Sequence, residues 1–66
     1  MKVVINGEDR DVKEGITVLA LLKELEVEPE ATVVQRNTEV LNRDDFAVTQ
    51  LDEGDQIELV RFVGGG

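Results

Sequence analysis

This 66-residue chain contains one strongly amphipathic helix pattern, which limits the folds that it can adopt. Four apolar residues recur at the i, i+3, i+4 and i+7 spacing that gathers side chains on one helical face, namely Val18, Leu21, Leu22 and Leu25. Thr17 is placed to cap the first turn, and Pro29 predicts that the helix ends by about Val27. The rest of the chain must then cover this one apolar face.

Strand patterns flank the helix on both sides. Residues 3–5 are β-branched and end at Asn6-Gly7, a pair typical of a tight hairpin turn, so a second strand is expected around residues 10–12. Phe46 is expected beneath the sheet, at the end of a tight turn. Further strand candidates are residues 31–36, 39–41 and 56–63. These elements predict an α+β domain in which one helix packs on one face of a mixed sheet.

The composition excludes several classes of protein. The chain contains no Cys, His, Trp or Tyr, so it has no thiol nucleophile, no imidazole base and no Cys- or His-type metal site. A domain this short also buries too little surface to build both a core and a deep substrate cavity. We therefore expect a protein that is not an enzyme, binds no cofactor or metal, and acts through its surface or a terminus.

The charge is strongly acidic, with 15 acidic against 7 basic side chains and a net charge of −8. Such a surface repels phosphate backbones and anionic lipids, so nucleic acid and membranes are poor partners. A protein with a basic face is favoured, although the same charge also serves solubility. The longest apolar stretch, residues 18–22, is too short to span a bilayer, and no signal peptide is evident. We expect a cytoplasmic protein.

Three glycines follow the last strand candidate. Gly64, Gly65 and Gly66 make up half of the six glycines in the chain. Because glycine lacks Cβ, such a tail can extend and pass through a channel too narrow for other residues, bringing a terminal carboxylate to its end. The alternative is a frayed end without function. The chain is thus divided into a folded domain, residues 1–63, and a flexible tail, residues 64–66.

Together these features resemble the ubiquitin-like β-grasp sulfur carriers, and over its whole length the chain is most similar to the ThiS family of thiamine biosynthesis. The resemblance rests on residues 1–8, the helix start at residues 15–18, Arg43 before an acidic and aromatic stretch, the Glu53-Gly54-Asp55 turn and the closing residues 62–66. Thr38 and Asn42 depart from the family pattern, since relatives often have Gly and Pro there. The resemblance implies a last strand that runs beside the first.

The resemblance also implies that partner enzymes act on the C-terminus. An ATP-using, E1-like adenylyltransferase of the ThiF type would adenylate the Gly66 carboxylate. Sulfur from a persulfide donor, such as a cysteine desulfurase, would displace AMP and leave a thiocarboxylate. This sulfur would pass to a thiazole synthase of the ThiG type, with Gly64 and Gly65 threading the tail into each partner. The chain itself contributes binding and presentation.

Strand alternation predicts a docking surface beside the tail. If Leu59 faces the core, Val60 and Phe62 point to the opposite face of the sheet, which in this fold carries no helix. Val4 would share that face, and these three residues could form an exposed apolar patch for partner enzymes. The alternative is that Phe62 is buried at the edge of the core. Arg61 could pair with an acidic group of a partner or of its own chain.

Other functions stay open. The chain could be another β-grasp sulfur carrier, such as a molybdopterin synthase small subunit or a cysteine-biosynthesis carrier, or a ubiquitin-like modifier joined to lysines. It could also be a noncovalent β-grasp binding module whose tail is irrelevant. Deleting Gly66 separates the last class, because a carrier loses all activity while a noncovalent module binds as before.

Overall fold

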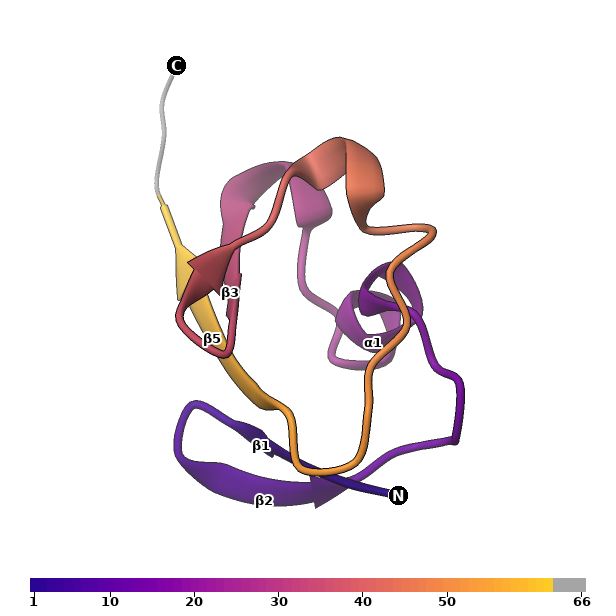
Figure 1. Ribbon diagram of the computed structural model, residues 1–66. Helices are drawn as coiled ribbons and strands as arrows, with labels where there is room; N and C mark the ends of the chain where they lie inside the picture. Colours follow the sequence, from indigo (N-terminus) through magenta and orange to yellow (C-terminus); the bar gives the residue numbers. More distant parts are fainter. Residues whose placement is uncertain (63–66) are drawn as a thin grey trace.

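The computed structural model describes residues 1–62, so Val63 and the predicted glycine tail lie outside the described residues. The strands are β1 (Lys2–Ile5), β2 (Glu8–Asp11), β3 (Thr32–Arg36), β4 (Glu39–Val40) and β5 (Gln56–Arg61), with the helix α1 (Val18–Glu24) and the 3₁₀ turns η1 (Pro29–Ala31) and η2 (Arg43–Asp45). The strands form one sheet in the order β2-β1-β5-β3-β4. The helix α1 lies against one face of this sheet (Figure 1). The predicted mixed sheet on one helix is confirmed.

The hairpin between β1 and β2 turns at Asn6 and Gly7. Their φ angles are 50° and 82°, the two positive values that a type I′ turn requires. The second strand begins at Glu8, two residues earlier than expected. The side-chain oxygen of Asn6 also accepts a hydrogen bond from the backbone N–H of Leu59 at 2.8 Å. The turn is thereby attached to β5, which runs parallel to β1.

The helix α1 is capped at both ends by local hydrogen bonds. At its start, Thr17 Oγ1 accepts from the N–H of Ala20 at 3.1 Å. At its end, Glu26 takes a left-handed conformation with φ 57°. The N–H of Val27 then donates back to the carbonyl of Leu22 at 2.9 Å, which closes the helix in a Schellman motif.

The helix thus ends within the predicted limit of about Val27, but not for the predicted reason. The backbone reverses at Glu26, so the α-helix stops at Glu24. Pro29 does not end the helix but begins η1. At the first position of a helical turn the backbone N–H makes no internal hydrogen bond, so proline loses none there.

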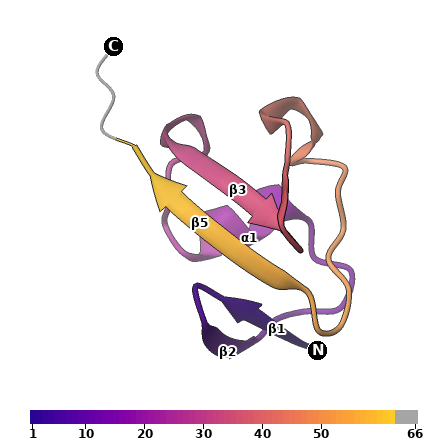
Figure 2. The ribbon, with the colours of Figure 1, turned by 60° about the vertical axis from the view of Figure 1, so that its left-hand side comes forward.

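The core fills the space between α1 and the sheet. Its buried side chains are Val18, Leu21 and Leu22 from α1, Val3, Ile5, Val34 and Ile57 from the sheet, and Val12, Ile16, Phe46 and Leu51 from the connections. Phe46 is 3% exposed, so its predicted burial is confirmed. Within residues 1–62 no helix covers the other face of the sheet, which we call the outer face (Figure 2).

A buried carboxylate holds the β3–β4 turn to the start of β5. Asp55 is 6% exposed and accepts hydrogen bonds from Arg36 Nε at 2.8 Å, Asn37 Nδ2 at 3.0 Å and the N–H of Asp52 at 2.7 Å. Burial alone raises the pKa of Asp55. The Asp52 amide, the Asn37 amide and the Arg36 guanidinium outweigh that effect, and the pKa of Asp55 is lowered overall.

Candidate partner-docking site

Val60 and Phe62 lie on the outer face, at the C-terminal end of β5. Val60 is 56% exposed and Phe62 is 47% exposed, whereas Ile57 on the opposite side of the same strand is 2% exposed. This alternation is the one expected of a strand that is packed on one face only. Phe62 is therefore not buried at the edge of the core, and its role in docking stays a prediction.

A backbone hydrogen bond fixes the position of Phe62. Its N–H donates to the carbonyl of Ala31 at 3.0 Å, which continues the pairing of β3 with β5 one residue beyond Arg61. The aromatic side chain is thus presented from a paired backbone directly before Val63 in the sequence. Such anchoring lowers the backbone conformational entropy that would be lost when a partner binds Phe62.

Two more valines join these residues. Val33 of β3 lies directly opposite Val60, and Val40 of β4 lies opposite Gln35, the next outer-face position along β3. Val33 is 37% exposed and Val40 is 61% exposed. We call Val33, Val40, Val60 and Phe62 the apolar patch. A shallow depression of about 230 Å³ runs along Val33, Val40 and Phe62.

Val4 does not belong to the apolar patch. It lies on the outer face but is half-buried and pairs with Gln56. Gln56 precedes Val60 by four residues, roughly 13 Å along a strand, and the polar side chains of Gln56 and Glu58 occupy the outer face between them. The expected patch of Val4, Val60 and Phe62 is corrected accordingly.

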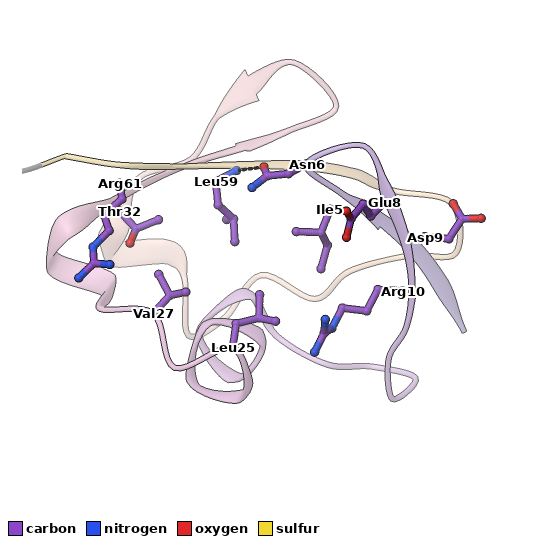
Figure 3. A pocket seen from close by; sticks show the side chains of 10 residues that line it. All are labelled: Ile5, Asn6, Glu8, Asp9, Arg10, Leu25, Val27, Thr32, Leu59 and Arg61. Carbon is purple, nitrogen blue, oxygen red and sulfur yellow. Dashed lines mark hydrogen bonds between the residues drawn. The ribbon is translucent and has the colours of Figure 1, made fainter.

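Arg61 also lies away from the apolar patch. It is paired with the buried Thr32 on the α1 side of the sheet, where it lines a groove with Leu25 and Val27 (Figure 3). Glu58 faces the other way, and no carboxylate of residues 1–62 lies within ion-pair distance of Arg61. The predicted docking residues therefore occupy two different faces of the sheet.

Sequence reasoning missed Val33 and Val40. The available signal was alternation, because Val33 sits between Thr32 and Val34, which both face the core. The expected roles of Gly64, Gly65 and Gly66 stay predictions, since these residues lie outside the described part.

Two further findings concern the described residues. No group of three or more carboxylates among them is arranged to hold a metal ion. None of the helices in this part of the chain is long and apolar enough to cross a membrane.

Similarity to known proteins extends over the whole chain. A family model described as the ThiS family matches residues 3–66. The sulfur carrier protein ThiS of Bacillus subtilis (strain 168) is 35% identical over 63 residues, covering 94% of this chain and 96% of that protein. Thiazole synthases of Paramagnetospirillum magneticum and Magnetococcus marinus are 44% and 42% identical over 66 residues, and the chain spans 20% of the length of each.

The fold is shared as well. The crystal structure of the thiamine biosynthesis protein ThiS from Geobacter metallireducens matches with a TM-score of 0.86 and 38% identity, covering 100% of both chains. A solution structure of a thiamine biosynthesis protein from the same organism gives a TM-score of 0.80 over 100% of this chain and 88% of that one. The predicted ubiquitin-like β-grasp fold is thereby confirmed. This chain belongs to the ThiS family.

Proposed function

We propose that this protein is a sulfur carrier of thiamine biosynthesis that bears sulfur on the carboxylate of Gly66. The observation that carries the proposal is the 35% identity, over 96% of its length, to a protein named as a sulfur carrier. The composition agrees with this function, because a chain without Cys or His can still carry reactive sulfur on a terminal carboxylate.

The proposed chemistry begins with activation of an unreactive group. The Gly66 carboxylate attacks the α-phosphate of ATP on a ThiF-type adenylyltransferase, releasing pyrophosphate and forming an acyl-adenylate. The outer sulfur of a donor persulfide then attacks the acyl carbon and AMP leaves. A thiol attacks the donor's sulfur in the resulting acyl disulfide, which frees the thiocarboxylate and leaves a disulfide on the donor side.

In this chemistry the carrier positions its own C-terminus in the active site of each partner. A glycine tail brings the terminal atom to a partner's active site, while the folded body fixes where the tail begins. The apolar patch supports this role, because Val60 and Phe62 are exposed next to Val63, where the predicted tail is reached in the sequence. Each partner that binds this patch would hold the tail at the same distance from its docking site.

A thiazole synthase of the ThiG type is the proposed acceptor of the sulfur. Two thiazole synthases contain a segment similar to this entire chain, which supports a functional link between carrier and synthase. The ThiF-type enzyme, the persulfide donor and the cytoplasmic location stay predictions, as does the use of ATP by the partner and not by the carrier.

Exchange of labelled pyrophosphate into ATP tests the activation step. With a purified ThiF-type enzyme, the full chain should support exchange, whereas a variant that lacks Gly66 should support almost none, since its terminus is displaced by one residue, about 3.5 Å. Equal exchange with both chains would contradict Gly66 as the attachment point. A full chain that never supports exchange, but still binds its partner, would favour a noncovalent binding module.

A further inference from the structure

The central strand β5 has a neighbour along only part of one edge. On the side of β1, the paired residues are Val4 with Gln56 and Ile5 with Ile57. Beyond that point β1 turns into the hairpin, whereas β3 accompanies β5 as far as Arg61. Figure 2 shows β1 beside the first half of β5 only.

The hydrogen-bond pattern tells which backbone groups face this open edge. The N–H of Asn37 donates to the carbonyl of Gln56 at 2.8 Å, and the N–H of Phe62 donates to the carbonyl of Ala31 at 3.0 Å. In an antiparallel pair such bonds alternate, so Leu59 and Arg61 direct their backbone groups away from β3. Asn6 accepts from the N–H of Leu59. The Leu59 carbonyl and the Arg61 N–H then face an edge where residues 1–62 supply no strand.

A groove of about 470 Å³ with a mixed polar and apolar lining lies beside this edge, on the α1 side of the sheet. Its apolar lining consists of Ile5, Leu25, Val27 and Leu59 (Figure 3). The helix α1 stops at Glu24, and Leu25 and Val27 of the segment that follows it line the groove on the side opposite β5. A side chain of an added strand that points toward α1 would enter this groove.

The charged side chains along the groove determine which charge is favoured in a bound segment. Arg61 and Arg10 lie at its two ends, and neither is within ion-pair distance of a carboxylate in the described chain (Figure 3). Glu8 and Asp9 also line the groove at the hairpin end, so their negative charges compensate the positive charge of Arg10 there. The lining near Arg61 contains no carboxylate. An acidic group is therefore favoured at the Arg61 end.

We propose that an extended segment of a partner protein adds to the sheet as a strand beside Leu59 and Arg61. The backbone of this segment forms hydrogen bonds with the open edge of β5. One of its apolar side chains enters the groove, and an acidic residue pairs with Arg61. This site is separate from the apolar patch, because it lies on the opposite face of the sheet. It does not depend on the proposed sulfur chemistry.

A peptide titration followed by NMR tests this proposal. The probe is the capped peptide Glu-Val-Ile-Val-Glu, which brings an acid to Arg61 in either strand direction. Its controls are Lys-Val-Ile-Val-Lys, which reverses the charge, and Glu-Val-Pro-Val-Glu, whose proline removes a backbone donor. At up to about 5 mM, the first peptide should shift the amide signals of Leu59, Arg61 and Val27, and both controls should bind more weakly.

Variants make the test specific. Arg61→Gln should raise the Kd of the probe about threefold, while Lys13→Gln, which removes the same charge at an exposed position outside the groove, should leave it unchanged. Equal binding of the acidic and basic peptides, shifts confined to Val60 and Phe62, or no shifts at all would overturn the proposal. Shifts that follow protein concentration without peptide would also overturn it, because a second copy would then occupy the edge.

Discussion

Val33 of β3 lies directly opposite Val60 of β5 on the outer face, and both side chains are exposed. Cross-strand pairs of this kind usually gain stability by burial against a second layer, but here the described chain supplies none. Phe62 lies two residues after Val60 on the same face and lines a depression with Val33, so the three side chains form one apolar surface directly before the predicted tail. A partner that covers this surface would gain the transfer free energy of the exposed apolar groups.

Phe62→Ala should weaken activation without unfolding the protein. The side chain is 47% exposed, so its loss costs little in the core but removes a large apolar contact with a partner. We expect kcat/KM for adenylation, measured with a ThiF-type enzyme, to fall about tenfold. Val48→Ala serves as the control, because Val48 is 76% exposed and does not belong to the apolar patch. Unchanged kinetics for Phe62→Ala would contradict docking through this patch.

Asp55→Asn should destabilise the fold in a pH-dependent way. The substitution weakens the charged hydrogen bond from Arg36, so the free energy of unfolding should fall by about 1–3 kcal/mol near neutral pH. Because the pKa of Asp55 is lower in the folded than in the unfolded chain, its stabilisation is present above the ordinary value of 3.8. This stabilisation declines as the pH falls below that value and is lost once the folded carboxyl is protonated.

Urea unfolding of both proteins between about pH 7 and about pH 3 measures this effect. The difference in the free energy of unfolding should shrink as the pH falls. A difference that stays constant over this range would show that the charge of Asp55 contributes nothing, and that only its shape matters.

Thr38→Gly should stabilise the protein. Thr38 has φ 75° in the turn between β3 and β4, a conformation that is costly for a β-branched side chain and easy for glycine. We expect the free energy of unfolding to rise by about 1 kcal/mol, measured by urea unfolding. Thr38→Ala controls for loss of the side chain and should give a smaller gain. A loss of stability for Thr38→Gly would mean that Thr38 makes contacts outweighing its backbone strain.

Glu26→Gly tests how the helix ends. Glu26 is exposed and has φ 57°, so glycine should raise the free energy of unfolding by about 0.5–1 kcal/mol. Substituting glycine at the neighbouring helical residue Glu24 should instead lower it, because glycine is unfavourable within a helix. If both substitutions destabilise equally, the left-handed closure at Glu26 is not what stops the helix.

Local patterns in the sequence predicted much of the fold. The spacing of Leu21, Leu22 and Leu25 and the Asn6-Gly7 pair act over a few residues, so each element could be placed without knowing the rest. The cause of the helix end was missed because a left-handed Glu26 carries no sequence signal of the kind that glycine gives. Pro29 offered a competing signal, but it lies beyond the point at which the helix has already ended.

The docking site depends on contacts that sequence patterns do not encode. Val33 meets Val60 only because β3 is the neighbour of β5. Local patterns do not give this pairing, and the family resemblance predicted only that the last strand runs beside the first. Arg61 was grouped with Val60 and Phe62 by nearness in sequence, yet alternation along the strand turns it to the α1 side. The distance between Val4 and Val60 likewise follows from the register of β1 on β5.

Intact mass spectrometry shows whether Gly66 carries sulfur. The protein is incubated with a ThiF-type enzyme, ATP, a cysteine desulfurase and cysteine, and its intact mass is then measured. We predict a mass increase equal to the exchange of one oxygen for sulfur, located at Gly66 by fragmentation and absent without ATP. An unchanged mass in a reaction that consumes ATP, or a ladder of conjugates with other proteins in place of this shift, would show that Gly66 does not serve as a sulfur carrier terminus.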